Sequence, residues 1–209
     1  STTEKPVLLN NIEDAEAFVS GAEVAVIGFF QAKLSPRVQN FSIMTENKSR
    51  LGLCRTAVTV GVFACLQVDN DRRDLDMNNR DVDAKKLTRF VRMNELRLVT
   101  EYNPVTAIGV MQSSLEFNLL LITDKMSPKH PERMRKFRAA AELYKGKILF
   151  VLLDTNLKSN ERVVSYFQLK KSQLPALAVF HTPDDEHDVL TLDEISIERV
   201  QDFCNRFLQ

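Results

Sequence analysis

The sequence predicts an α/β protein built from two copies of one domain plan, and three observations support this. Continuous apolar runs at residues 24–30 and 148–153 are typical of strands buried on both faces of a sheet. Segments with apolar residues at helical spacing alternate with such strands. Both halves of the chain also end in a helix that carries a phenylalanine in a matching place, Phe90 in the first half and Phe203 in the second.

The first half of the chain shows the plan with one piece missing. Asn11 can cap a first helix, which Gly21 ends. The expected elements after it are a strand at 24–30, a short strand near 41–43, a strand over 58–68, a charged turn at 74–83, and a helix that follows Asp83.

The second half shows the full order βαβαβαββα. Its expected elements are a strand at 98–100, a helix from Pro104, a strand at 119–122, a helix from Pro131 to Gly146, a strand at 147–154, a helix capped by Ser159, strands at 176–181 and near 189–190, and a last helix from Ser196. We place the domains at residues 1–95 and 96–209. At 209 residues the chain is long enough for two such domains, each with its own core.

Charge and hydropathy exclude two classes of partner. Lysine plus arginine and aspartate plus glutamate both number 28, so no net field favours nucleic acid or an anionic membrane. No apolar run reaches the roughly 18 residues of a membrane-spanning helix. We therefore expect neither nucleic acid nor membrane as a partner, and we expect a monomer.

Four stretches of sequence carry a family resemblance. Gln173-Leu174-Pro175-Ala176 resembles the thioredoxin fold, in which the proline before the fourth strand is usually cis, so Pro175 is a candidate cis-proline. Residues 101–106, 145–150 and 170–176 resemble the b′ domain of the protein disulfide isomerase family, and the nearest likeness is to a non-catalytic member with b and b′ domains only.

The resemblance implies two tandem thioredoxin-like domains in a protein of the endoplasmic reticulum lumen. The first domain is abbreviated, because residues 31–40 are too few for the second helix of the family. The second domain would be the client-binding one.

The cysteines argue against dithiol catalysis. Cys54, Cys65 and Cys204 are the only three, and no two form a C-x-x-C pair. A catalytic thioredoxin domain needs a thiolate directly after its buried strand, but residues 31–33 and 123–128 contain no cysteine. We interpret Cys65 and Cys204 as buried residues that pack in the core, and we place Cys54 on a loop. The chain is thus predicted not to be an enzyme.

The resemblance implies a groove for unfolded polypeptides in the second domain. Aromatic and methionine side chains give such a groove an adaptable apolar surface. The positions that match are Tyr102, Met111, Leu120, Val163, Tyr166 and Phe180. Ordinary core packing is the alternative, above all for Leu120 and Phe180. Tyr166 is the better candidate, because Val163 and Phe167 already supply the inward face of its helix.

The resemblance also implies a docking loop for the thiol oxidoreductase associated with the lectin chaperones. The matching residues are Asp185, Glu186, His187 and Asp188, with His187 where the family motif has tryptophan. Carboxylates can steer a basic partner, whereas the loss of the tryptophan removes an aromatic anchor. A protonated His187 between carboxylates would weaken docking at mildly acidic pH. A solvated turn is the alternative.

We predict no cofactor and no metal. The three histidines, His130, His181 and His187, have no ligand spacing. A calcium loop starting at Asp69 would place Asp74 where glycine is required and Arg80 where the bidentate glutamate belongs.

The sequence thus predicts a non-catalytic chaperone or adaptor. Two alternatives stay open: a thiol-exchange enzyme that uses Cys54 alone, and a structural or calcium-buffering protein of the same compartment.

Overall fold

The computed structural model describes residues 7–21, 24–30, 50–55, 62–66, 72–76, 84–94 and 96–209. The chain forms two compact units, Ser1–Arg97 and Leu98–Gln209. The division therefore falls two residues beyond the predicted boundary, directly before the first strand of the second unit. Each unit is described by itself below.

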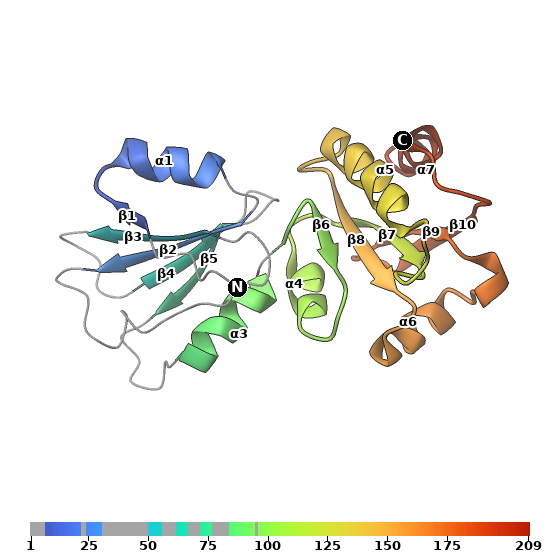
Figure 1. Ribbon diagram of the computed structural model, residues 1–209, viewed down its shortest axis with the longest axis horizontal. Coiled ribbons are helices and arrows are strands. Elements are labelled where there is room, and N and C mark those ends of the chain that lie inside the picture. Colours follow the sequence, from blue (N-terminus) through green and yellow to red (C-terminus); the bar gives the residue numbers. More distant parts are fainter. Residues whose placement is uncertain are drawn as a thin grey trace. The chain divides into compact units, whose positions relative to one another are not determined.

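The second unit has the predicted order of elements (Figure 1). Its strands are β6 (Val99–Glu101), β7 (Phe117–Thr123), β8 (Ile148–Asp154), β9 (Ala176–His181) and β10 (Glu186–Thr191). Its α-helices are α4 (Thr106–Gln112), α5 (His130–Leu143), α6 (Glu161–Tyr166) and α7 (Ile197–Phe207). Two single-turn 3₁₀ helices, η1 (Lys158–Asn160) and η2 (Lys171–Gln173), flank α6.

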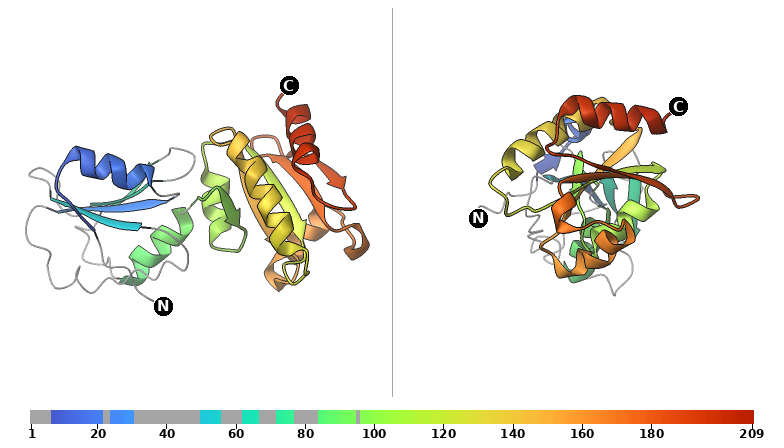
Figure 2. Two further views of the ribbon diagram at one scale, coloured as in Figure 1. Left: turned by 45° about the horizontal axis from the view of Figure 1, so that its top comes forward. Right: turned by 90° about the vertical axis from the view of Figure 1, so that its right-hand side faces the viewer.

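These strands form one mixed sheet in the order β10-β9-β7-β8-β6. Strands β6 and β7 lie parallel to β8, whereas β9 is antiparallel to β7 and β10 is antiparallel to β9. Helices α5 and α7 cover one face of the sheet, and α4 and α6 lie on the other (Figures 1 and 2). Parallel neighbours need such crossover helices, which explains the alternation seen in the sequence.

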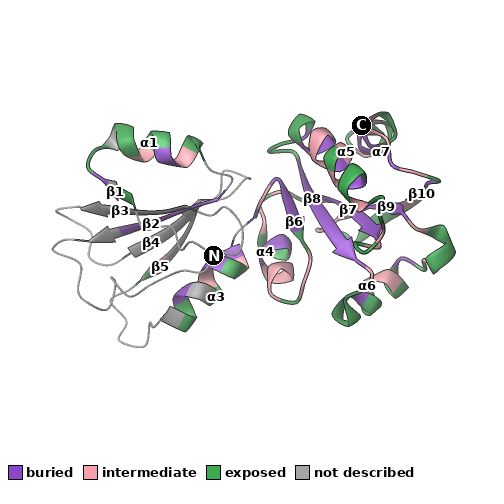
Figure 3. Ribbon diagram, in the orientation of Figure 1, coloured by how far each residue is buried: buried purple, intermediate pink, exposed green. Residues whose placement is uncertain are grey.

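The main core lies between the sheet and helices α5 and α7. Because side chains alternate along a strand, every second residue of β7 faces this core, and the residues between them face α4 and α6. Core members include Leu119, Leu121, Phe150, Leu177, Val179, Phe137, Val200 and Phe203. Figure 3 shows β8 buried along its length, as its unbroken apolar sequence predicts.

The first unit repeats this strand arrangement. Its elements are β1 (Val7–Leu9), α1 (Ile12–Ser20), β2 (Ala25–Phe30), β3 (Arg50–Arg55), β4 (Val62–Leu66), β5 (Arg72–Asp76) and α3 (Ala84–Asn94). The order β1-β3-β2-β4-β5 matches β6-β8-β7-β9-β10 strand for strand, with the same parallel and antiparallel pairs. The predicted fold class, an α/β protein with two tandem domains of one kind, is therefore confirmed.

Two predictions for the first unit are wrong. The charged turn placed at 74–83 begins with the end of strand β5, which pairs with β4 alone and so forms the edge of the sheet. Charged residues are common in edge strands, and they concealed this one. Cys54 lies in β3, between β1 and β2, and not on a loop. The predicted strand at 41–43 and the predicted loss of a second helix fall outside the described residues.

The helix caps agree with the sequence in two cases out of three. Asn11 accepts a hydrogen bond from the backbone N–H of Asp14 at 2.7 Å, and Ser196 caps α7 through Arg199 at 3.2 Å. Ser159 does not cap α6, because it lies inside η1 and the helix begins at Glu161. The Leu174–Pro175 peptide bond is cis, at the position that the resemblance indicates.

Candidate functional site

A pocket of about 300 Å³ opens on the second unit, on the face of the sheet that carries α4 and α6. All six positions named from the sequence line it: Tyr102, Met111, Leu120, Val163, Tyr166 and Phe180. Five further residues complete the lining: Val110, Asn118, Val151, Arg162 and Phe167. The structure thus brings together side chains that are up to 78 positions apart, from Tyr102 to Phe180.

The floor of the pocket is the sheet itself. Leu120 of β7 lies opposite Val151 of β8 and Ala178 of β9, and Asn118 lies opposite Phe180. Residues directly opposite one another point to the same face, so these side chains form one surface. Leu120 is buried, whereas Phe180 is partly exposed.

The first wall comes from the segment between β6 and β7. Tyr102 extends β6, since its backbone N–H donates to the carbonyl of Leu152 at 2.8 Å. The Asn103 side chain then accepts from the backbone N–H groups of Val105 and Thr106, both at 2.9 Å, and this turn starts α4. Burial raises the pKa of the Tyr102 hydroxyl. Met111 ends this wall with 54% of its surface exposed.

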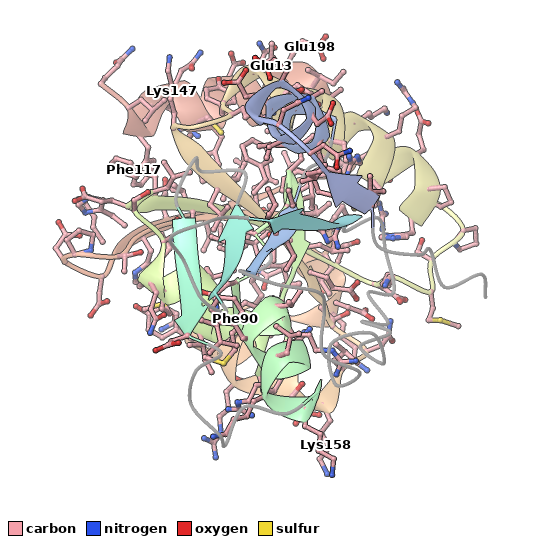
Figure 4. The ribbon with its side chains drawn as sticks, turned by 90° about the vertical axis from the view of Figure 1, so that its left-hand side faces the viewer. Glu13, Phe90, Phe117, Lys147, Lys158 and Glu198 are labelled. Atoms are coloured by element: carbon pink, nitrogen blue, oxygen red, sulfur yellow. The ribbon has the colours of Figure 1, made fainter. Side chains whose placement is uncertain are left out.

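Helix α6 forms the second wall. Val163, Tyr166 and Phe167 are three and four residues apart, so they share one face of the helix. The Tyr166 ring meets Phe167 edge-on at 5.1 Å and Phe180 at 6.3 Å between centroids. Phe167 is buried beneath it, whereas 48% of Tyr166 is exposed. Figure 3 shows the outward side of α6 exposed, and Lys158 of the preceding turn points away from the domain (Figure 4).

Asn118 and Val151 could have been found from the sequence. Asn118 is the one amide in the apolar run Phe117–Thr123. It lies two residues before Leu120, so both side chains point to the same face of the sheet. Val151 has the equivalent place in β8. Arg162 stands at the exposed start of α6, and nothing in the sequence pattern marks it.

The predicted docking residues do not form a single loop surface. Glu186, His187 and Asp188 belong to the edge strand β10, opposite His181, Phe180 and Val179 of β9. Only Asp185 lies in the turn before it, with a left-handed φ of 59° that aspartate tolerates. Strand alternation therefore places Glu186 and Asp188 on one face of the sheet and His187 on the other. The sequence predicted this strand only near residues 189–190, because its first three residues are polar.

His187 belongs to the rim of the pocket. Its ring lies 5.1 Å from that of Tyr166 and 5.7 Å from that of Phe167, and its Nδ1 is 3.4 Å from the Tyr166 hydroxyl. The histidine that lies between two carboxylates is instead His181. The expected imidazole between carboxylates was therefore assigned to the wrong histidine.

His181 stabilises the turn that leads into β10 through contacts with two carboxylates. Its Nδ1 is 2.7 Å from a carboxylate oxygen of Asp184, and its Nε2 is 3.3 Å from one of Glu116. The ring also packs on Phe117 at 4.5 Å. The hydrogen bond with Asp184 is the main cause that raises the pKa of His181. Glu116 thus adds a carboxylate to the acidic end of the sheet that sequence reasoning missed.

The loop after β7, where a catalytic relative would carry its nucleophile, is a polar turn. Asp124 accepts from the backbone N–H of Met126 at 2.8 Å and from Asn156 at 2.6 Å. Cys204, interpreted as a core residue, is buried in α7, and burial raises the pKa of its thiol to about 12. The side chains of Cys54 and Cys65 fall outside the described residues.

Metal sites and membrane-spanning helices are two further possibilities. Within the described ranges, no three histidine, cysteine or acidic side chains are placed to hold a metal ion. The acidic segment considered for calcium falls partly in strand β5 and partly outside the described residues. In the part of the chain that the structure describes, no helix is both long and apolar enough to cross a membrane.

Comparisons with known proteins agree with this architecture. The family profile of the thioredoxin-like domain matches residues 59–206. Endoplasmic reticulum resident protein 27 from human is 43% identical, over 98% of this chain and 79% of its own length. The same protein from cattle is 40% identical, over 99% of this chain and 80% of its own. Rabbit protein disulfide-isomerase is 32% identical over 93% of this chain, but the match spans only 40% of that protein.

The chain therefore belongs to the protein disulfide isomerase family, as its sequence motifs indicated. The predicted location in the endoplasmic reticulum is confirmed by the relatives that carry that name.

Proposed function

We propose that this protein binds apolar segments of unfolded polypeptides in the pocket of its second domain, without dithiol catalysis. One observation carries the proposal. The pocket is walled by Met111 and Tyr166, which are both about half exposed beside a floor that is apolar except for one amide. Apolar side chains that are exposed together around a pocket are typical of a binding site, whereas single exposed ones are not. Methionine and aromatic side chains together suit a site that accepts varied apolar sequences.

The size of the pocket supports a peptide and not a folded domain as the ligand. About 300 Å³ lies at the lower end of the range for ligand pockets, which is roughly 300–1,000 Å³. It can hold one or two large side chains of an extended segment. The rest of the segment would lie across the exposed surface of α6 and the edge of the sheet.

The thiol chemistry supports the proposed lack of dithiol catalysis. Exchange of a disulfide needs a thiolate that a substrate can reach. The sequence has no cysteine pair at the nucleophile position of either domain. Cys204 is buried with a pKa of about 12, so it stays a protonated thiol at neutral pH. A thiol-exchange role through Cys54 alone would require a residue of an inner strand to act as nucleophile.

A fluorescence titration tests the binding role. A labelled apolar peptide should bind the protein and should lose its binding to Tyr166→Asp, which places a charge in the aromatic wall. Leu143→Asp is the matched control, because Leu143 is 55% exposed on α5 and does not line the pocket. If both variants bind as the parent protein does, the peptide site lies elsewhere.

We further propose that the acidic end of the sheet recruits a thiol oxidoreductase, the one associated with the lectin chaperones. Asp184, Asp185, Glu186 and Asp188 are exposed there, on the turn and the edge strand β10. An exposed group of like charges steers a basic partner and fixes its register. Glu186→Lys should abolish this complex and leave peptide binding unchanged, as measured by surface plasmon resonance. Docking that survives the charge reversal would place the partner on another surface.

A further inference from the structure

Asn118 is a polar side chain in the apolar floor of the pocket. It is 2% exposed, and its neighbours along β7 and on both adjacent strands are apolar. An amide among such neighbours costs free energy unless its donors and its acceptor are hydrogen-bonded. Its presence at this place therefore requires an explanation.

Among the described residues, only one end of the amide has a hydrogen-bond partner. Its Nδ2 donates to the hydroxyl of Thr182 at 3.0 Å. Its Oδ1 is buried and has no hydrogen-bond partner among the residues that the structure describes. The bond to Thr182 holds the nitrogen, so the oxygen is the end left for a ligand.

The walls around Asn118 restrict which donor can reach this oxygen. A charged ammonium or guanidinium group would lose its hydration among Leu120, Phe167 and Phe180. The indole of tryptophan combines a large apolar ring with a single N–H donor and no acceptor. A tyrosine hydroxyl can also donate, but its acceptor lone pairs need a second donor, which the apolar neighbours Leu120, Phe167 and Phe180 do not supply. Phenylalanine has no donor at all.

We propose that the pocket prefers a tryptophan side chain of an unfolded polypeptide, whose indole N–H donates to Oδ1 of Asn118. This inference rests on the proposed peptide-binding function, and it names the residue class that the site selects. The rings of Tyr166 and Phe167, which lie edge-to-face, would then enclose the indole. The ranking is tryptophan, then tyrosine, then phenylalanine.

A pair of peptides isolates the single hydrogen bond. The two are identical except that one carries tryptophan and the other 3-benzothienylalanine, which keeps the ring shape and replaces N–H by sulfur. Calorimetry on the full chain should show about tenfold tighter binding of the tryptophan peptide, the effect of one buried hydrogen bond. The protein has no tryptophan, so a blue shift of the peptide emission independently reports entry of the indole into the pocket.

The variant Asn118→Leu removes the acceptor at nearly constant side-chain size. It should bring the two peptides to within about twofold of each other, because neither now meets a polar atom on the floor. Should this variant fail to fold, the peptide pair measured on the parent protein still decides the matter.

The outcomes separate this inference from the proposed function. Equal affinities of both peptides for the parent protein, with both lost in Tyr166→Asp, overturn the role of Asn118 and leave the pocket as the binding site. Tighter binding of the benzothienyl peptide also overturns it, because the amide would then not be presenting its oxygen. Binding of both peptides that is unaffected by Tyr166→Asp refutes the proposed function itself.

Discussion

An ion pair on the opposite face of the sheet gives the sharpest prediction of stability. Arg133 of α5 is buried, and its guanidinium donates to both carboxylate oxygens of Glu194, at 2.7 and 3.1 Å. A third bond of 3.2 Å joins Arg133 to Thr123 at the end of β7. The pair therefore fastens the segment before α7 to α5 and to the central strand. We expect Glu194→Gln to weaken the second domain.

The size of the expected loss of stability follows from the pKa shift of the Glu194 carboxylate. Hydrogen bonds from Arg133 are the main cause that lowers the pKa of Glu194 from 4.5 to about 2. Each pKa unit corresponds to about 1.4 kcal/mol, but the Glu194 side chain is 34% exposed, and solvent screening reduces its share. We therefore expect Glu194→Gln to cost about 1–2 kcal/mol of the free energy of unfolding at neutral pH.

The contribution of the Arg133–Glu194 pair to stability also depends on pH. A lowered carboxylate pKa adds stability above the unfolded value of 4.5, and this share is lost as the pH falls from 4.5 towards 2. The difference between the parent protein and Glu194→Gln should therefore be full at pH 7 and shrink over that window.

Tyrosine fluorescence during urea unfolding is a selective assay. All three tyrosines, Tyr102, Tyr144 and Tyr166, lie in the second domain, and the chain has no tryptophan. Glu142→Gln is the control, because Glu142 is exposed on the same helix. Equal unfolding midpoints for Glu194→Gln and Glu142→Gln at pH 7 would refute the reasoning.

Three further predictions concern single side chains of the second domain. Cys204 should resist alkylation in the folded protein at neutral pH, since burial raises its pKa to about 12, and mass spectrometry should find it modified only after unfolding. Met111→Ala should weaken peptide binding about two- to tenfold in calorimetry with little change in the urea midpoint, because the side chain is half exposed in the free protein; a large loss of stability would instead make Met111 a core residue. The raised pKa of His181 means that its bond with Asp184 is complete below pH 6.5 and weakens as the pH rises through the raised value. The protection factors of the amides at 182–185, which are exchange rates corrected for intrinsic base catalysis, should therefore fall across that range in the parent protein and stay constant with pH in His181→Gln.

Much of the second domain could be predicted because its signals are local. The apolar runs of β7 and β8 are short, and this length favours strands over helices, while Pro131 and Ser196 mark helix starts. In the pocket, Leu120 and Phe180 could be named only through the family resemblance, because no periodicity distinguishes a pocket floor from a core.

The residues that were missed depend on neighbours far along the chain. Strands β5 and β10 are edge strands with polar surfaces, so β5 was predicted to start a turn and β10 was predicted only near residues 189–190. The role of Asn118 depends on Thr182, 64 positions away, and on the walls that leave its oxygen unpaired. Glu116 reaches His181 only because β9 pairs with the start of β7, 65 positions away along the chain. Spacing patterns along the sequence do not predict such long-range contacts.

Chemical-shift mapping of the full chain with an unlabelled apolar peptide tests the central claim most directly. We expect the largest amide shifts in α4, α6 and the facing residues of β7 and β9, and small ones in α5 and α7. Shifts concentrated on the face covered by α5 and α7, or at the polar turn after β7, would contradict a peptide site in this pocket.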